Sequence, residues 1–280
     1  MIFNRNGHLF HLDAPAVMGI VNVTPDSFYS GSRFMDPSEA LSVVDGMIAD
    51  GASIIDFGAC STRPGAETVS SEVELQRLSP VLDAVRTKYP DILISIDTFY
   101  AATAATAAAR WRVDIINDIS GVSDPDMPDV IAANSLVYVL MHSRSIPSDM
   151  QNHCNYKDVT AEVISELAFR LDLLRAKGVK DVIIDPGFGF AKNLDQNYQL
   201  MAELSEFKKI GPPVLVGISR KSMITSLLGR SSGDVLEATT ALNTAAMMQG
   251  ADIVRVHDVR AAADAARIIR KLNEYRICPS

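Results

Sequence analysis

The sequence predicts an α/β protein, a single (β/α)8 TIM barrel that carries a short N-terminal β-hairpin. Eight short apolar runs recur along the 280 residues, separated by segments with helical spacing. Eight strand–helix units match the roughly 250 residues of such a barrel, with room for a short extension. The apolar runs are nearly unbroken, as expected for parallel strands that helices cover. We therefore predict one domain, 1–280, with the hairpin at 1–13 and the barrel at 14–280.

The strand and helix patterns follow one another along the chain. Asn4-Arg5-Asn6-Gly7 lies between two short apolar runs and favours a hairpin turn. The predicted barrel strands are Ala16–Val23, Ser53–Phe57, Ile92–Asp97, Asp114–Asp118, Leu136–Met141, Asp181–Asp185, Val214–Ile218 and Ile253–Val256. The clearest predicted helices are Pro37–Asp50, Tyr100–Arg110, Val159–Lys177 and Arg260–Tyr275. A doubly wound open sheet is the alternative, but no Gly-x-Gly-x-x-Gly motif follows the first strand.

Composition limits the partners that the protein can have. The net charge is −8 and no basic stripe offsets it, which argues against a nucleic-acid partner. Acidic residues interrupt the apolar runs well short of a membrane span, so no membrane partner is expected. The cysteines, Cys60, Cys154 and Cys278, are scattered without metal-ligand spacing, which favours a reducing cytoplasmic compartment. A small-molecule substrate held by local positive charge fits this composition.

Polar side chains close almost every predicted strand. In a barrel, the carboxyl ends of the strands face the active-site mouth. A single aspartate there is ordinarily the N-cap of the next helix, whereas the same pattern at eight ends indicates a site. Alternate residues share a face, so Arg255 and His257 should point the same way, as should Ser219 and Lys221 if that strand extends so far. The strand-end residues are Asn22, Asp56, Asp97, Asn117, Asp118, His142, Asp185, Ser219, Arg220, Arg255 and His257.

These residues divide into two chemical groups. The acceptor-rich group is Asp56, Asp97, Asn117 and Asp185. Buried carboxylates need hydrogen-bond donors or a nearby cation, which a planar heterocycle with adjacent N–H groups and Lys221 would supply. The donor-rich group, which suits phosphate oxygens, is Asn22, Thr62, Arg63, Arg255 and His257. The sequence therefore predicts a substrate with a nitrogen heterocycle at one end and phosphate at the other.

Seven motifs in order carry a family resemblance. They are Asn22-Val23-Thr24-Pro25-Asp26-Ser27-Phe28, Ser61-Thr62-Arg63-Pro64-Gly65, Ile96-Asp97-Thr98, Asn117-Asp118, Asp185-Pro186-Gly187-Phe188-Gly189-Phe190, Ser219-Arg220-Lys221 and Arg255-Val256-His257. From about Met18 to His257, the chain resembles the dihydropteroate synthase family of pterin-binding barrels. The resemblance implies a cytoplasmic, homodimeric transferase of folate biosynthesis that uses Mg²⁺ and is inhibited by sulfonamides. Such an enzyme joins 6-hydroxymethyl-7,8-dihydropterin diphosphate to p-aminobenzoate and releases pyrophosphate.

The resemblance also assigns roles position by position. It puts the pterin ring against Asp97, Asn117, Asp185 and Lys221, with Met141, Phe190 and Gly217 packed around it. It puts the diphosphate against Asn22, Arg63, Arg255 and His257, with the Mg²⁺ held by Asn22. It puts p-aminobenzoate among Phe28, Thr62, Pro64, Phe190 and Lys221, with its carboxylate near Ser222. The catalytic residues that it implies are Asp97, Lys221, Arg63, Arg255 and His257, acting without a covalent enzyme intermediate.

Several departures from the family, including Ser30-Gly31-Ser32 and Ser143-Arg144, and several alternatives bear on this hypothesis. The usual Asp-x-Gly-Gly-Glu of the family is here Asp56-Phe57-Gly58-Ala59-Cys60, which bears on loop conformation and sulfonamide sensitivity. Cys60 as a nucleophile is one alternative, but no partner base is evident, so a passive role is favoured. A pterin-binding corrinoid methyltransferase would not require Ser-Thr-Arg-Pro-Gly. A Schiff-base aldolase using Lys221 leaves the acceptor residues idle, and a non-catalytic homologue conflicts with the intact motifs. His142 and His153 are interpreted as structural.

Overall fold

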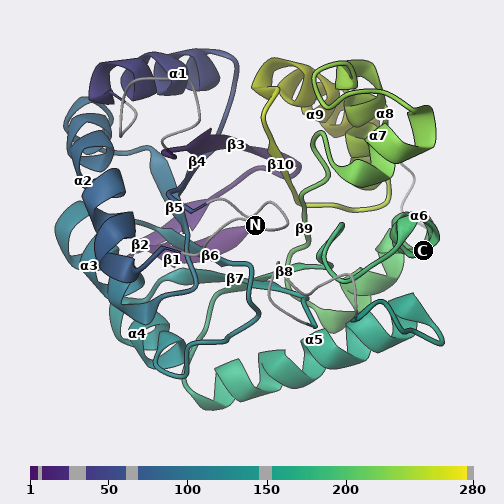
Figure 1. Cartoon of the computed structure of the whole chain (residues 1–280), viewed down its shortest axis with the longest axis horizontal. Helices are drawn as coiled ribbons and strands as arrows, with labels where there is room; N and C mark the ends of the chain where they lie inside the picture. Colours follow the sequence, from purple (N-terminus) through teal and green to yellow (C-terminus); the bar gives the residue numbers. More distant parts are fainter. Residues whose placement is uncertain (6–7, 25–35, 61–68, 145–152, 276–280) are drawn as a thin grey trace.

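Eight parallel strands form a nearly closed barrel in the computed structural model, which describes residues 1–5, 8–24, 36–60, 69–144 and 153–275 (Figure 1). Their order around the barrel is β8-β7-β6-β5-β4-β3-β10-β9. A parallel bridge between Ile184 and Val214 brings β8 back to β9, and the Ile184 amide donates to the Pro213 carbonyl at 2.9 Å. The strands are β3 (Ala16–Asn22), β4 (Ile54–Gly58), β5 (Leu93–Asp97), β6 (Ile115–Asp118), β7 (Val137–Met141), β8 (Val182–Asp185), β9 (Leu215–Val216) and β10 (Ile253–Val256).

Helices surround the barrel and follow the sequence signals for helix starts. The Asp36 carboxylate caps the first of them by accepting the Ser38 amide at 2.7 Å. Asn193 and Gln196 form a capping box at the start of another. The helices are α1 (Pro37–Ala49), α2 (Ser71–Lys88), α3 (Ala101–Trp111), α4 (Met127–Asn134), α5 (Val159–Ala176), α6 (Leu194–Ala202), α7 (Ser222–Leu228), α8 (Leu236–Met248) and α9 (Val259–Asn273). A 3-10 helix, Leu204–Ile210, precedes β9.

Seven of the predicted strands are found to within one residue at each end, whereas the seventh is less than half its predicted length. That strand was predicted at Val214–Ile218, but β9 contains only Leu215–Val216 and is followed by two helices, α7 and α8. The chain turns instead, because the Lys221 amide donates to the Ile218 carbonyl at 3.1 Å. Arg220 also adopts a positive φ of 58°. The strand geometry that would have put Ser219 and Lys221 on one face does not persist.

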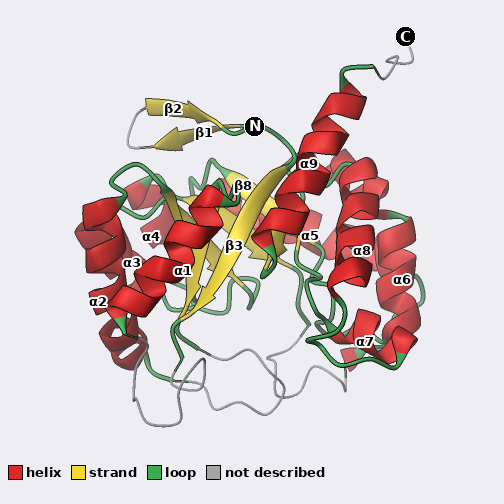
Figure 2. Cartoon of the chain, turned by 90° about the horizontal axis from the view of Figure 1, so that it is seen from above, coloured by secondary structure: helices red, strands yellow, loops and turns green. Residues whose placement is uncertain are grey.

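The predicted N-terminal hairpin is confirmed, and it closes the end of the barrel at which the strands begin (Figure 2). Its strands are β1 (Ile2–Arg5) and β2 (His8–His11). Phe3 and Leu12 are buried against apolar side chains that point into the barrel. The Asn4 amide donates to the Asp181 carboxylate at 2.8 Å, at the start of β8. We call this apolar end the floor, and its barrel residues are Ala16, Met18, Ile54, Ile115, Val137, Val139, Ile183, Leu215 and Ile253.

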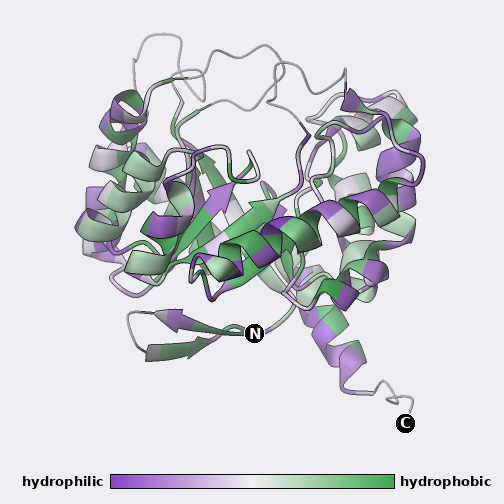
Figure 3. Ribbon diagram, turned by 90° about the horizontal axis from the view of Figure 1, so that it is seen from below, coloured by the Kyte–Doolittle hydropathy of each residue, from purple (hydrophilic) through white to green (hydrophobic). Residues whose placement is uncertain are grey.

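The alternation of side chains along each strand separates two cores. Inward residues form the floor, whereas outward residues such as Val17 and Ile55 pack against the surrounding helices. The strands and the inner sides of the helices are largely hydrophobic, and hydrophilic residues mark the outer sides (Figure 3). Among the helices in the described part of the chain, none is both long enough and apolar enough to cross a bilayer.

Candidate active site

The carboxyl ends of the strands bring a layer of polar side chains into the barrel above the floor. Asp97 on β5 lies in register with Gly58 on β4 and with Asn117 on β6. Asp56 lies one step deeper and is fully buried. Asp118, the residue after Asn117, points the other way, and its carboxylate accepts the Tyr138 hydroxyl at 2.5 Å. The two-residue period thus separates a site residue from a structural one within Asn117-Asp118.

Arg255 joins two of the acidic residues. Its Nε donates to Asp56 Oδ2 at 2.7 Å, and its Nη2 donates to Asp97 Oδ2 at 2.7 Å. Asn117 Nδ2 also reaches Asp56 Oδ2, at 3.4 Å. Asp56 Oδ1 is buried without a hydrogen-bond partner among the described residues. Burial raises the pKa of Asp97 to about 7, although the positive charge of Arg255 opposes that shift. One guanidinium therefore compensates two carboxylates only in part, which leaves acceptor capacity for a ligand.

Lys221 and Asp185 form the second half of the layer. The Lys221 ammonium donates to the Phe188 carbonyl at 2.6 Å and lies 4.7 Å from the centre of the Phe190 ring. Burial lowers the pKa of Lys221 to about 8 and raises the pKa of Asp185. A Cβ at Gly217 would lie 4.0 Å from Asp185 Oδ2 and 3.9 Å from Arg255 Cβ. Gly217 therefore leaves space between the carboxylate and the arginine.

His257 lies beyond Arg255 at the end of β10 and is exposed. Its Nδ1 is 3.1 Å from Ser219 Oγ, which also accepts the His257 amide at 3.2 Å. Desolvation, with the nearby charges of Arg255 and Arg220, lowers the pKa of His257. Arg220 itself forms a two-point ion pair with Asp258. The neutral imidazole is thus held by a hydroxyl and is available to donate or accept at Nε2.

The remaining predicted residues lie around this layer or outside the described part of the chain. Asn22 is exposed at the end of β3, and Ser222 begins α7. Met141 and Phe190 belong to an apolar cluster with Ile119 and Ala191. The predicted site residues that lie outside the described part of the chain are Phe28, Thr62, Arg63 and Pro64. The structure therefore brings together Asp97, Asn117, Asp185, Gly217, Lys221 and Arg255 from five strands or strand ends.

Comparison with known proteins identifies the family. Residues 18–257 match the model of the family described as "Pterin binding enzyme". The dihydropteroate synthase of Escherichia coli is 42% identical over 265 residues, covering 94% of this chain and 93% of that protein. The chain belongs to the dihydropteroate synthase family. This family consists of transferases of folate biosynthesis, so the predicted family and enzyme class are confirmed.

Solved structures of dihydropteroate synthases confirm the barrel. The crystal structure of the Yersinia pestis enzyme with a sulfonamide drug complex has a TM-score of 0.90 and 37% identity, covering 99% of this chain and 100% of that one. The Xanthomonas albilineans enzyme in complex with 7,8-dihydropteroate has a TM-score of 0.86 and 33% identity, with the same coverage of both chains. Other relatives are longer. The chain spans only 32% of a probable bifunctional folylpolyglutamate synthase/dihydropteroate synthase of Haloferax volcanii.

Sequence reasoning missed a buried polar group next to the dihydropteroate synthase motifs. Lys192 is only 3% exposed, and its ammonium contacts the fully buried His142. His142 in turn contacts Glu166, which Arg144 holds in place. Lys192 follows Asp185-Pro186-Gly187-Phe188-Gly189-Phe190 by two residues, and a lysine so close to an apolar motif was the available signal. Cys60 fits its favoured passive role, because burial raises the pKa of its thiol.

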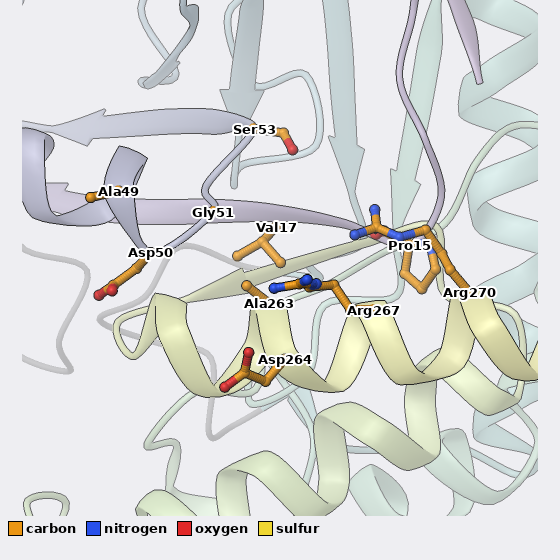
Figure 4. Close-up of a pocket in the computed structure, with 10 residues that line it drawn as sticks. All are labelled: Pro15, Val17, Ala49, Asp50, Gly51, Ser53, Ala263, Asp264, Arg267 and Arg270. Atoms are coloured by element: carbon orange, nitrogen blue, oxygen red, sulfur yellow. The ribbon is translucent and has the colours of Figure 1, made fainter.

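A separate small pocket lies away from this layer, between α1 and α9 (Figure 4). Its volume is about 150 Å³, and its lining includes Pro15, Val17, Gly51, Ser53, Arg267 and Arg270. Pro15 and Ser53 precede β3 and β4, so this pocket belongs to the floor end of the barrel. None of the residues that carry the dihydropteroate synthase resemblance lines it.

Proposed function

We propose that this chain catalyses the dihydropteroate synthase reaction. It condenses 6-hydroxymethyl-7,8-dihydropterin diphosphate with p-aminobenzoate, giving 7,8-dihydropteroate and pyrophosphate. The observation that carries the proposal is the buried acceptor layer of Asp97, Asn117 and Asp185, with Lys221 beside it. Family membership supports the same conclusion.

A pterin ring offers the hydrogen-bond donors that the carboxylates of this layer need. Its amino group and ring N–H groups are adjacent donors in one plane, whereas the Asp185 and Asp97 carboxylates offer acceptors inside the barrel. Burial raises the pKa of both groups, so donors from a ligand would stabilise their charged forms. Lys221 supplies a further donor, and Met141 and Phe190 offer apolar surfaces for the ring. We propose that Gly217 leaves room for the edge of the ring.

The proposed reaction is a substitution at the pterin methylene. The carbon–oxygen bond to the diphosphate breaks, and pyrophosphate leaves with the electron pair. The lone pair of the p-aminobenzoate nitrogen forms the new carbon–nitrogen bond, and that nitrogen then loses one proton. Arg255 and His257, with Arg63, stabilise the leaving group through charge and hydrogen bonds. Asp97 stabilises the positive charge that develops on the pterin.

Asn22 fits the proposed magnesium ion. A Cβ at Gly58 would lie 3.5 Å from Asn22 Oδ1 and 3.8 Å from Asp97 Oδ2, so the glycine leaves space beside both oxygens, of which Asp97 Oδ2 also accepts Arg255. No group of three or more histidine, cysteine or acidic residues in the described ranges has metal-binding geometry. One amide oxygen suffices for Mg²⁺ that is held mainly by phosphate and water. When bound, Mg²⁺ would neutralise charge on the diphosphate.

The other expected partners also remain part of the proposal. We propose that p-aminobenzoate, or a sulfonamide in its place, lies by Phe190 and the Lys221 stem, with its acidic group near Ser222. Phe28, Thr62 and Pro64, which lie outside the described residues, would complete this subsite. We propose a homodimer formed through late helices around 241–248, where Met248 is 50% exposed. A cytoplasmic location stays an expectation from charge and cysteine usage.

The proposal is tested by pyrophosphate release from the purified protein. The assay contains the dihydropterin diphosphate and Mg²⁺, with and without p-aminobenzoate. We expect release that requires p-aminobenzoate and is suppressed by a sulfonamide and by removal of Mg²⁺ with a chelator. Binding of the pterin without any release would favour a corrinoid methyltransferase, and the next assay would then supply a corrinoid protein and a methylfolate.

A further inference from the structure

Lys192 is buried and its Nζ has three polar partners, although burial lowers the pKa of this lysine to about 7. Its Nζ donates to the carbonyls of Gly187 and Phe190, each at 3.0 Å, and to His142 Nδ1, also at 3.0 Å. Burial of an ammonium is costly unless every donor finds an acceptor, so this arrangement is stable only as a complete set. Two of the three acceptors are backbone atoms of the loop that follows β8.

The proton positions in this group follow from its acidic neighbour. Arg144 donates to Glu166 through Nε at 2.9 Å and Nη2 at 2.5 Å. Hydrogen bonding to His142 and Arg144 lowers the pKa of Glu166 to about 2, so Glu166 is an ionised acceptor. His142 Nε2, 3.0 Å away, must then carry the imidazole proton. Nδ1 is therefore the lone-pair acceptor that Lys192 requires.

The loop itself is shaped so that it lies against this group. Gly187 has a φ of 72°, and a Cβ there would lie 2.0 Å from the His142 carbonyl oxygen. The Gly187 amide donates to Asp185 Oδ1 at 2.7 Å, which orients that carboxylate. The Phe190 amide donates to the Gly187 carbonyl at 3.1 Å, the same carbonyl that Lys192 holds. Displacement of Lys192 would therefore disturb Asp185 and Phe190 together.

Two lysines hold this loop, and only one is assigned to the ligand. Lys221 holds the Phe188 carbonyl at 2.6 Å. Because an ammonium has three donors, Lys221 can hold that carbonyl and also donate to the pterin. Lys192 lies behind the loop, 3% exposed, and its contacts do not need to change when a ligand arrives.

We propose that Lys192, held by His142, is a positioning residue that fixes the loop 185–190 and so sets the orientation of Asp185 and Phe190 toward the pterin. The inference rests on the proposed function, because it concerns the substrate side of the same site. It predicts an unequal defect: the pterin, which contacts both Asp185 and Phe190, loses more affinity than p-aminobenzoate, which contacts Phe190 but not Asp185.

Steady-state kinetics with each substrate varied separately tests this selectivity. Lys192→Met removes the donors at similar side-chain length, and Lys177→Met on the surface of α5, where the lysine is 54% exposed, is the matched control. We expect Lys192→Met to raise the pterin KM at least tenfold and the p-aminobenzoate KM by no more than about threefold. Equal changes in both constants, or no change in either, would overturn the inference. Wild-type activity judges the proposed function separately.

A second test does not depend on the stability of that variant. Nitrogen NMR of the wild-type protein reports the His142 tautomer, with the signal assigned by its loss in His142→Asn. We expect a protonated Nε2 and an unprotonated Nδ1 at neutral pH, and a shift of Nδ1 in Lys192→Met. His142→Asn retains an acceptor close to Nδ1 and should keep the pterin KM within threefold, whereas His142→Leu should not. A protonated Nδ1, or equal effects of Asn and Leu, would refute the positioning role.

Discussion

The two ends of the barrel interior are built by inward-facing residues of the same strands, two positions apart, yet their chemistry is opposite. At the floor, Ile54 begins β4 and packs among apolar side chains with the hairpin residue Phe3. Asp56 lies two positions further along the same strand and is equally buried, but it carries a carboxylate. One of its oxygens has no hydrogen-bond partner among the described residues. Apolar burial at the floor stabilises the fold, whereas the mouth carries charges that are incompletely compensated. The difference separates residues that hold the barrel from residues that await a ligand.

The largest expected effect is that of Asp97→Asn at the mouth. The amide keeps the size of the side chain but carries no negative charge. It therefore cannot balance the positive charge of Arg255 or the positive charge that develops on the pterin. We expect kcat/KM to fall by at least about 10³-fold, or about 4 kcal/mol, in an assay of dihydropteroate formation. Asp172→Asn, at a side chain that is 79% exposed on α5, should leave the rate unchanged. Near-wild-type turnover of Asp97→Asn would remove Asp97 from the mechanism.

At the floor, Ile54→Ala should affect stability and spare the chemistry. Ile54 is fully buried, so truncation leaves a cavity and should lower the free energy of unfolding by about 2–5 kcal/mol. Urea unfolding measures that loss. The kcat per folded molecule should stay within twofold of wild type. A variant that keeps its stability but loses turnover would contradict the division between the two ends.

The pH dependence of stability should come from the mouth. Burial lowers the pKa of His142 from its ordinary 6.5 to about 4. Between these values the unfolded chain binds more protons than the folded one, so this group makes stability rise with pH, by about 3 kcal/mol across the window. Urea unfolding of the wild type and of His142→Asn at several pH values should differ by this rise, because the shifts of His257, Asp97 and Asp185 are common to both proteins. Ile54→Ala should keep it, and a rise of equal size in both variants would assign it to other groups.

Lys221→Gln should sharpen the comparison within the mouth itself. Glutamine keeps an amide N–H2 as donor but loses the positive charge beside Asp185. The charge of Lys221 favours the ionised form of that carboxylate. A hydrogen bond from a charged group contributes about 1.5–3 kcal/mol, so the pterin dissociation constant should rise about 10- to 100-fold. Titration calorimetry measures it, with Lys177→Gln as the control. Equal affinities would show that Lys221 does not touch the pterin.

Much of the fold was predictable because each strand is a short apolar run that ends in a polar residue. The strands β3 to β8 and β10 were found near their predicted places for this reason. The predicted seventh strand is too long, since Gly217 and Ile218 look like strand residues but the chain turns after them, with Arg220 at a positive φ. The local pattern of residue types does not predict such a turn.

The site was predictable in composition but not in pairing. Arg255 was grouped with the phosphate-binding donors, whereas its guanidinium lies between Asp56 and Asp97, 199 and 158 positions away along the chain. That contact depends on which strands are neighbours and on their register, which residue types alone do not encode. Lys192 was missed for a similar reason, because its acceptors are backbone carbonyls and a histidine 50 positions away.

The central claim is that the mouth of this barrel joins a pterin to p-aminobenzoate. The most direct measurement is mass-spectrometric detection of the product formed by the wild-type chain with both substrates and Mg²⁺. The account predicts 7,8-dihydropteroate in equal amount to the pyrophosphate released, and none with Asp97→Asn. Pyrophosphate without dihydropteroate, or methyl transfer to a corrinoid protein in its place, would contradict it.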